Sequence, residues 1–354
     1  MMKAYITSFG IVSPQGSPIN DSWLDEMILY HTSLIRCIEP DFKELIPPIY
    51  LRKMPRILKI GLYAAMMCLR NQTSQPDAIT TGTGFGCLEE LEKFLAQVIE
   101  SNGKIMFPTS FIHSTNNLVG SQIAMMTKNN NYNMNYVHRS FSFENALTDT
   151  MLLLEEKQAI NVLTGCIDEI TDYHFKVYGY LDFWKASIIC NKELYSIDTK
   201  GTIAGEGSAF FNISSEYSSE NPIINGVHTF YKPDNHEEIN QNFELFLNSS
   251  EIQKNKIDLL LLGKNGDQQF DSIYDNFATD NFSSNIQIAL YKKLCGEYHT
   301  STGFALGVAC TILKNRKIPA SLVVSGNSKK EIRNILIYNQ YRNTEHSFIL
   351  IGME

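Results

Sequence analysis

Residues 132–157 read YNMNYVHRSFSFENALTDTMLLLEEK, a stretch that passes from a predicted strand to a predicted helix within a few residues. The strand is YNMNYV, at 132–137. Apolar residues then recur at helical spacing in a helix expected from Phe143 to Lys157: Ala146, Leu147, Met151 and Leu154. Glu144 falls in the first turn of this helix, beside the positive end of its dipole. The turn between the two elements, HRSFS, is therefore the place where we look for a functional residue.

Strand-like segments alternate with helix-like segments along the rest of the chain, without a flexible linker or a low-complexity break. We expect helices in the gaps between the strands, which is the pattern of an α/β protein whose sheets are covered by helices. The last two strands are rich in Ile and Leu and read as buried or half-buried. The predicted strands are 3–12, 77–84, 132–137, 159–167, 207–213, 257–263 and 346–353.

The chain has 354 residues, and its composition, with 44% hydrophobic and 19% charged residues, is typical of a folded protein. The start MMKAYITSFGIVSPQG is too broken for a signal peptide, and no apolar run approaches the roughly 18 residues that span a bilayer, so we expect a cytoplasmic protein. Seven cysteines without a CxxC pair indicate buried, reduced thiols and no metal site. A formal net charge of −8 argues against nucleic acid as a partner.

Six stretches, taken in order, resemble the β-ketoacyl synthases, the condensing enzymes of fatty acid and polyketide synthesis. The fourth resembles the dimer-interface segment of that family. The resemblance implies a thiolase-like fold, with two pseudo-repeated halves at 1–215 and 216–354 that form a five-layered αβαβα sandwich. The stretches are ITSFGIVSPQG (6–16), LRKMPRILK (51–59), TGTGFGCLEELEKF (81–94), PTSFIHSTNNLVGSQIAM (108–125), IAGEGSAFF (203–211) and GEYHTSTGFALG (296–307).

Glycines in two of these stretches have a physical reason to be there. Gly205 and Gly207 flank Glu206, and Gly303 precedes Phe304. A residue without Cβ allows close approaches and backbone conformations that a side chain would block. We therefore expect structural turns at both places.

The resemblance places the nucleophile of the condensing enzymes at Ser140, where the family has a cysteine. A cysteine thiol has a pKa of roughly 8.5 that a helix N-terminus can lower, whereas a serine hydroxyl gains almost nothing without a base beside it. Cys166 is the nearest cysteine after this turn, but it lies at the end of the next predicted strand. We expect it to be a small buried core residue.

The first of the two family histidines maps to a glycine. Counting from Asp258, and requiring Asp271 to match the loop-closing Asp of the family, places Gly263 at the histidine position. Glycine has no side-chain donor, and loss of one preorganised donor typically costs on the order of a hundredfold to a thousandfold in rate. Asn265 or Lys264 is a substitute donor if the loop has moved.

The second family histidine is retained as His299, with Lys293 upstream near the position of the family lysine, one residue further away than usual. His299 is either a hydrogen-bond donor or a structural remnant. His138 lies two residues before Ser140, so strand alternation can aim both side chains to one side as a Ser-His pair. The alternative for His138, and for His113, is a partly buried histidine at a subunit contact.

A scaffold that keeps the fold and loses the nucleophile resembles the chain length factors, which pair with an active ketosynthase. The segments HRSFSFENAL and CGEYHTSTGF are most similar to the ketosynthase-like proteins of aryl polyene and flexirubin-type pigment clusters. In such pairs a bulky side chain of one subunit can close the acyl tunnel of the other. Leu91, Phe111 and Ile112 fall at matching places, with plain core packing as the alternative.

Two functions remain open at this point. The first is a non-condensing partner of an active ketosynthase in polyene or fatty acyl chain elongation. The second is an enzyme, either a β-ketoacyl synthase with rearranged groups or a serine acyltransferase that uses Ser140 with His299 or His138.

The resemblance implies no bound cofactor, because the substrates are carried on the phosphopantetheine arm of an acyl carrier protein. The predicted partners are that carrier protein and either an active ketosynthase or a second copy of the chain. Carrier proteins are themselves acidic and usually dock on basic patches. Because this chain is acidic overall, binding a carrier protein would require a basic patch on part of its surface.

Overall fold

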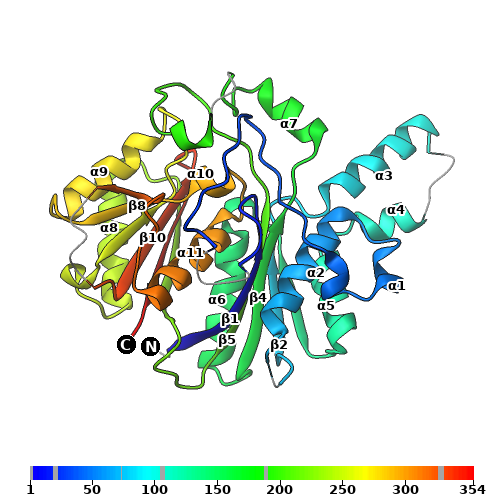
Figure 1. The fold of residues 1–354 in the computed structure, drawn as a ribbon, viewed down its shortest axis with the longest axis horizontal. Helices are drawn as coiled ribbons and strands as arrows, with labels where there is room; N and C mark the ends of the chain where they lie inside the picture. The colour runs from blue at the N-terminus through cyan, green and yellow to red at the C-terminus, as the bar shows by residue number, and fades with distance from the viewer. Residues whose placement is uncertain (1–2, 19–22, 73, 104–107, 187–189, 326–330) are drawn as a thin grey trace.

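The computed structural model describes residues 3–18, 23–72, 74–103, 108–186, 190–325 and 331–354. Within these ranges eleven strands form one mixed sheet, in the order β3-β2-β4-β5-β1-β6-β11-β10-β7-β8-β9 (Figure 1). The strands of its first part are β1 (Ala4–Val12), β2 (Ala78–Gly82), β3 (Tyr132–Tyr136), β4 (Asn161–Asp168) and β5 (Gly207–Ser214). Those of its second part are β6 (Ile223–Tyr231), β7 (Leu259–Leu262), β8 (Gln287–Leu290), β9 (Val323–Ser325), β10 (Asn334–Tyr341) and β11 (Glu345–Gly352).

The two parts of the sheet repeat one topology. In the first part β1 pairs antiparallel with β5, β5 antiparallel with β4, and β4 parallel with β2, which in turn pairs parallel with β3. The second part repeats this order with β6, β11, β10, β7 and β8. A short antiparallel contact between β1 and β6 joins the parts. The predicted boundary at 215/216 lies in the connection between β5 and β6.

Helices cover both faces of each part of the sheet, because each sheet face is apolar and has to be buried. Helices α2 (Arg56–Leu69) and α5 (Leu118–Thr127) pack on the outside of the first part, and α8 (His236–Ser249) and α9 (Asp271–Asn281) on the outside of the second. Helices α6 (Ser142–Glu155) and α11 (Ser301–Asn315) lie between the parts (Figure 1). The predicted five-layered αβαβα sandwich is confirmed. The remaining helices are α1 (Pro48–Leu51), α3 (Leu88–Glu100), α4 (Pro108–His113), α7 (Asp172–Gly179) and α10 (Lys292–Cys295).

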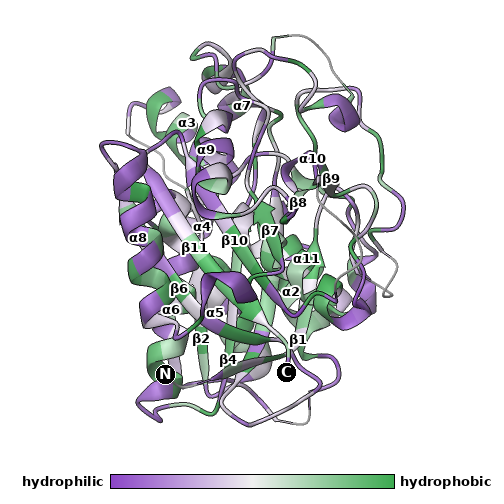
Figure 2. Cartoon of the chain, turned by 90° about the vertical axis from the view of Figure 1, so that its left-hand side faces the viewer, coloured by the Kyte–Doolittle hydropathy of each residue, from purple (hydrophilic) through white to green (hydrophobic). Residues whose placement is uncertain are grey.

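Hydropathy follows the layers. Every residue of α11 from Ser301 to Leu313 is buried, as expected for a helix with sheets on both sides. The outer helix α8 instead presents a hydrophilic face to solvent, while the strands behind it are hydrophobic (Figure 2). The central layer is thus the innermost part of the core.

All seven predicted strands are present, but the expectation that only helices fill the gaps between them is wrong. The gaps also contain β6, β8, β9 and β10. Strand β10 carries the polar residues Asn339 and Gln340, which interrupt its apolar pattern. Both are buried, and the Asn339 side-chain oxygen accepts a hydrogen bond from the Tyr291 hydroxyl at 3.0 Å. A polar residue is tolerated inside a central strand when such a partner satisfies it.

The basic segment at 51–59 serves a buried ion pair. Arg56 Nη2 lies 2.6 Å from Glu206 Oε1, and Arg56 Nη1 lies 2.9 Å from Glu206 Oε2. Glu206 is 1% exposed and also accepts hydrogen bonds from the backbone N–H groups of Cys37 and Ile170. The neighbouring Gly205 permits this packing, because a Cβ there would lie 1.9 Å from the carbonyl oxygen of Cys295.

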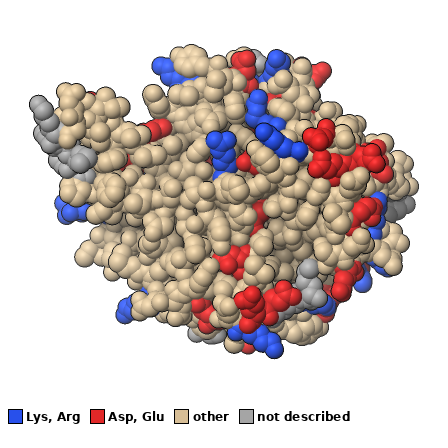
Figure 3. All heavy atoms as spheres, turned by 180° about the vertical axis from the view of Figure 1, so that it is seen from behind, with Lys and Arg blue, Asp and Glu red and all other residues tan. Residues whose placement is uncertain are grey.

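Helices α3 and α4 project from the body of the molecule, at the right of Figure 1. Seen from behind, charged side chains gather along the side away from this projection, while the surface beside it carries few (Figure 3). Large hydrophobic side chains are exposed on α3, α4, α5 and β3: Leu95, Ile99, Phe111, Ile112, Met125, Tyr132 and Met134. Solvated surfaces rarely expose so many apolar side chains together, so this region has the character of an interaction surface.

Candidate functional site

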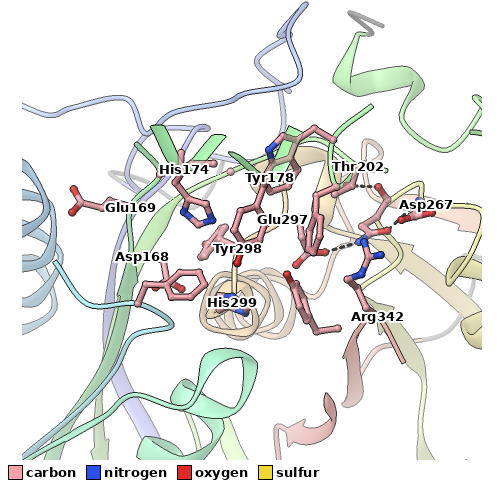
Figure 4. Close-up of a pocket in the computed structure, with 17 residues that line it drawn as sticks. Asp168, Glu169, His174, Tyr178, Thr202, Asp267, Glu297, Tyr298, His299 and Arg342 are labelled. Atoms are coloured by element: carbon pink, nitrogen blue, oxygen red, sulfur yellow. Dashed lines mark hydrogen bonds between the residues drawn. The ribbon is translucent and has the colours of Figure 1, made fainter. Parts of the chain in front are cut away.

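A narrow, half-open pocket lies between α7, the turn after β2 and the loop that leads into α11 (Figure 4). Aromatic rings make up much of its wall. Four carboxyl groups also line it, with one cationic side chain, Arg342. The lining residues are Phe85, Asp168, Glu169, Ile170, His174, Tyr178, Phe183, Trp184, Thr202, Gly205, Asn265, Asp267, Glu297, Tyr298, His299, Tyr341 and Arg342.

His299 lies at the deep end of this pocket, just before α11. Its ring packs edge-on against Phe85, with ring centroids 4.8 Å apart, and lies tilted against Tyr341, with centroids 4.7 Å apart. Its Nδ1 lies 2.8 Å from the Oγ of Ser140. Burial, with a smaller contribution from nearby Arg139, lowers the pKa of His299 to about 3. The imidazole is therefore neutral at physiological pH.

Ser140 lies behind His299 rather than in the pocket. It belongs to a 3-10 turn, Arg139–Phe141, and α6 begins two residues later at Ser142. Arg139 has a φ of +48°, which costs an L-residue roughly 1–2 kcal/mol. Ser140 is 3% exposed and does not line the pocket. Its hydroxyl is placed to orient the imidazole of His299.

The structure does not bring His138 to Ser140, and the predicted Ser140–His138 pair is wrong. The His138 side chain is exposed, and its Nδ1 lies 3.3 Å from the side-chain nitrogen of Asn145. Strand β3 ends at Tyr136, so strand alternation no longer holds at these two residues. His113 lies apart from the pocket, with Nδ1 3.7 Å from Glu90 Oε2.

Gly263 follows β7 and is closely packed. A Cβ there would lie 2.2 Å from the side-chain oxygen of Asn339 and 2.9 Å from the hydroxyl of Tyr274. These neighbours occupy the space that any side chain would need. A histidine at this position therefore requires the side chains of Asn339 and Tyr274 to move.

The two proposed substitutes for this histidine point to different places. Asn265 lines the pocket, and its side-chain nitrogen donates to Glu297 Oε2 at 2.7 Å. Lys264 points away from it and forms an ion pair with Asp275 at 2.8 Å. Asp271 closes the loop, since its carboxylate accepts from the N–H groups of Asn265 and Gly266, while burial raises its pKa to about 6.

The buried lysine of the site is Lys292, whereas the sequence prediction pointed to its neighbour Lys293. Lys292 is fully buried, and its Nζ lies 2.6 Å from both Glu297 Oε1 and the Ser301 hydroxyl. Glu297 thus joins Lys292 to Asn265. Neither Lys292 nor Glu297 was predicted. An adjacent Lys-Lys pair cannot be resolved from sequence, because the choice depends on which residue of α10 faces inward.

Asp168, at the end of β4, also escaped prediction. One carboxylate oxygen accepts from the Thr83 hydroxyl and the Gly84 N–H, and the other accepts from the N–H and hydroxyl of Thr300. It therefore ties the glycine-rich turn after β2 to the loop that carries His299. Cys166, two residues earlier, is buried as predicted and lies outside the pocket, and burial raises its pKa well above the ordinary thiol value.

His174 is the fourth residue that sequence analysis missed. It comes from α7, and its ring packs edge-on against Phe85, with centroids 5.2 Å apart. Burial lowers the pKa of His174 to about 4. The signal that could have found it is weak, because the segment TDYHF around it matches none of the recognised stretches.

The three predicted gating residues do not line this pocket. Leu91 is partly buried on α3, whereas Phe111 and Ile112 on α4 are 58% and 57% exposed. Core packing, the alternative for these residues, is therefore wrong for Phe111 and Ile112 in this chain. Phe111 contacts the ring of Phe94, with centroids 5.6 Å apart, and leaves its outer face to solvent.

No protein-family model and no curated protein matches the sequence. Solved structures match it over its whole length. One, described as the ishigamide ketosynthase/chain length factor, superposes with a TM-score of 0.81 at 12% identity and covers 100% of this chain and 99% of its own. The chain has the ketosynthase fold. The predicted thiolase-like architecture is thereby confirmed.

Two further structures give the same result. The Xenorhabdus doucetiae ketosynthase ApeO in complex with its chain length factor ApeC matches with a TM-score of 0.77 and 13% identity, over 100% of this chain and 98% of that chain. The complex AntDE:AntF, a type II polyketide synthase carrier protein with its ketosynthase bound to the hexaketide, matches with a TM-score of 0.79 and 11% identity over 100% of both chains. The narrower likeness to aryl polyene and flexirubin-type proteins stays a prediction.

The described residues contain no cluster of side chains that could hold a metal ion, and no helix among them is long and apolar enough to cross a membrane.

Proposed function

We propose that this chain is a non-condensing, chain-length-factor-type subunit that pairs with an active β-ketoacyl synthase in polyene or fatty acyl chain elongation. The observation that carries the proposal is the pocket beside His299, whose lining, among the residues that the structure describes, contains neither a cysteine nor a serine. Condensation needs a nucleophile in contact with the acyl group. Ser140 is shielded by His299, and the Gly263 position has no side chain, its space being filled by the side chains of Asn339 and Tyr274.

The charges in the pocket support the same conclusion. Condensation starts with decarboxylation of a malonyl group, which develops negative charge on the thioester oxygen, and donors or cations near the reacting centre stabilise that charge. The deep end beside His299 instead presents Asp168, and the one lining cation, Arg342, lies over the ring of Phe183 at the partly exposed end. A bound malonyl carboxylate would therefore lie close to a buried carboxyl group.

The surface beside β3 supports a paired state. Strand β3 is at the end of the sheet, so one edge of its backbone has no neighbouring strand within the described residues. Tyr132 and Met134 on this strand are exposed, as are Phe111 and Ile112 on the projecting α4. An exposed edge that carries apolar side chains is a pairing site, and a two-fold partner of the same fold would present the matching edge. Phe111 and Ile112 are then the residues placed to reach the acyl tunnel of the partner.

The partners follow from this proposal. They are an active ketosynthase, or a second copy of this chain, and the acyl carrier protein that delivers the growing chain on its phosphopantetheine arm. The structural match to a carrier protein complex supports the last of these. The cytoplasmic localisation stays a prediction.

Reconstitution with a co-expressed active ketosynthase of the same organism tests the function. We expect elongation from malonyl carrier protein only when both subunits are present, and a change in product length when Phe111→Ala is introduced. Met134→Lys on β3 is expected to separate the pair in native mass spectrometry, whereas Leu245→Lys, at a more exposed position on α8, leaves it intact. Full elongation by the ketosynthase without this chain would refute the proposal.

A serine acyltransferase is the second candidate, since the Ser140 hydroxyl and His299 Nδ1 are within hydrogen-bond distance. Intact-mass spectrometry after incubation with octanoyl-pantetheine separates the two functions. The partner function predicts no covalent adduct on this chain. An octanoyl adduct that is lost in Ser140→Ala would establish the transferase instead.

A further inference from the structure

The imidazole of His299 carries a single ring proton, and the position of that proton decides what the histidine presents to the pocket. Burial lowers the pKa of His299 to about 3, so the ring is neutral at pH 7. A neutral imidazole has one N–H donor and one acceptor nitrogen. The hydrogen bond that one ring nitrogen makes fixes which of the two carries the proton.

The ring nitrogen that is fixed in this way is Nδ1. It lies 2.8 Å from the Oγ of Ser140, which is buried and outside the pocket lining. His299 itself lines the pocket (Figure 4), so its second ring nitrogen, Nε2, is the one left for the pocket. If Ser140 donates to Nδ1, the proton is on Nε2. If Nδ1 donates to Ser140 instead, Nε2 has a lone pair.

A second acceptor competes for the hydroxyl proton of Ser140. Glu345, the first residue of β11, is 8% exposed, and β11 lies against the 3-10 turn that contains Ser140. Burial raises the pKa of Glu345, while the positive charge of Arg139 and a hydrogen bond from the Ser140 hydroxyl oppose that rise. These two interactions favour the carboxylate, which accepts hydrogen bonds and cannot donate one.

We propose that Glu345 is a positioning residue, which acts through Ser140 to hold the ring proton of His299 on Nδ1 and leaves the Nε2 lone pair for the pocket. A hydrogen bond to an ionised acceptor is roughly twice as strong as one between neutral groups, so the Ser140 proton goes to Glu345. The serine oxygen then accepts from the Nδ1–H group. Each of the two hydrogen bonds polarises and strengthens the other.

This order of side chains differs from that of a hydrolytic triad, in which the acid orients the histidine and the histidine activates the serine. In this chain the serine lies between the acid and the histidine, so Nδ1 has no lone pair to take the serine proton. An acceptor at Nε2 also cannot stabilise negative charge on a thioester oxygen. The value of this arrangement to a non-condensing subunit rests on the proposed function, whereas the position of the proton does not.

Nuclear magnetic resonance of the full chain with isotope-labelled histidine tests this inference at pH 7. In a long-range proton–nitrogen correlation spectrum, the ring nitrogen without a proton resonates well downfield of the protonated one. Only Nε2 couples strongly to both carbon-bound ring protons, which tells the two nitrogens apart. We expect the downfield nitrogen of His299 to be Nε2. His299→Gln removes these signals and thereby assigns them.

Two variants examine the roles of the partners. Glu345→Gln keeps the size of the side chain and removes its charge, and is expected to move the ring proton to Nε2. Ser140→Ala is expected to do the same, because Nδ1–H would be a buried donor without its partner. Glu237→Gln, exposed on α8, is the control and should leave the signals of His299 unchanged.

Two outcomes would overturn the inference: a proton on Nε2 in the parent protein, or a Glu345→Gln spectrum that matches that of the parent. The first needs no variant, and circular dichroism shows whether each variant is folded. Native mass spectrometry of Glu345→Gln with the ketosynthase is expected to show an intact pair, because Glu345 is buried. A chain that pairs with its proton on Nε2 would contradict only this inference. A chain with the proton on Nδ1 that does not pair would contradict only the proposed function.

Discussion

The Oγ of Ser140 and the Nδ1 of His299 lie 2.8 Å apart, although 159 positions separate them along the chain. Ser140 precedes α6 in the first half of the molecule, and His299 precedes α11 in the second. The two central helices therefore meet at this hydrogen bond. Because both groups are buried, the bond serves the fold and the orientation of the imidazole together.

Ser140→Ala is expected to lower the free energy of unfolding by about 1–2 kcal/mol, since it leaves a buried ring nitrogen without its partner. Urea denaturation measures the change. Ser283→Ala, at an exposed position, is the control and should change stability by less than about 0.5 kcal/mol. A Ser140→Ala protein as stable as the parent would show that the bond does not hold His299.

Gly84→Ala is expected to displace His299. An added Cβ at Gly84 would lie 2.6–2.8 Å from the Cβ, Cγ and Cδ2 atoms of the histidine. Overpacking of this kind typically costs about 1–3 kcal/mol. Thermal unfolding gives the cost, and the imidazole NMR signals of His299 report the displacement.

Gly179→Ala is the control for this substitution, because its nearest added contact, with a Trp184 carbon, is at an ordinary 3.8 Å. It should leave the His299 signals in place. If Gly84→Ala also left the His299 signals in place, His299 would not pack closely against the glycine-rich turn.

Arg56→Met is expected to be strongly destabilising, by about 3–5 kcal/mol, because it leaves the buried carboxylate of Glu206 without its main counter-charge. Arg333→Met removes an exposed ion pair with Glu331 and should cost less than about 1 kcal/mol. Guanidinium denaturation of the two variants measures both changes. Equal losses would mean that the buried pair contributes no more than a surface pair.

Glu144→Gln tests the pH dependence of stability. Burial raises the pKa of Glu144 to about 7, and its Oε2 has no hydrogen-bond partner among the described residues. Between about pH 4.5 and pH 7 the unfolded chain loses this proton while the folded chain keeps it, so stability falls as pH rises through that window. The glutamine variant has no such proton and should gain up to about 3 kcal/mol relative to the parent between pH 4.5 and pH 8.

The free energy of unfolding of the parent and of Glu144→Gln, measured at pH 4.5 and at pH 8, gives this difference in stability. Glu237→Gln, exposed on α8, should show the same pH dependence as the parent. A Glu144→Gln protein whose stability follows that of the parent at both pH values would place the carboxyl of Glu144 in an ionised, solvated setting.

Prediction from sequence succeeded where the signal is local. The seven strands and the helix at 143–157 were found because an apolar period of 2 or 3.6 is visible along a few neighbouring residues. Strand β10 was missed, since the buried Asn339 is satisfied by Tyr291, which lies 48 positions away. No local pattern shows that an amide will find such a partner.

In the candidate site, too, local sequence signals could be read, whereas contacts that form only after folding could not. Ser140 was assigned from the strand and helix around it, Gly263 by counting from Asp258, and His299 from its stretch, and these assignments to family positions stay predictions. The partner of Ser140 was left open between two histidines, and His138 proved to be exposed. His174 and Asp168 were not found, because each acts on segments that the chain brings together only after folding.

The sequence by itself determined the α/β order of elements and the absence of a cysteine at the turn before α6, because both depend only on which residues follow one another. The tertiary structure alone decided that Ser140 meets His299, that Lys292 rather than Lys293 faces inward, and that His174 faces the pocket. These contacts depend on how two halves of the chain pack against each other, and hydrogen bonds and burial act between neighbours in space, whatever their distance in sequence.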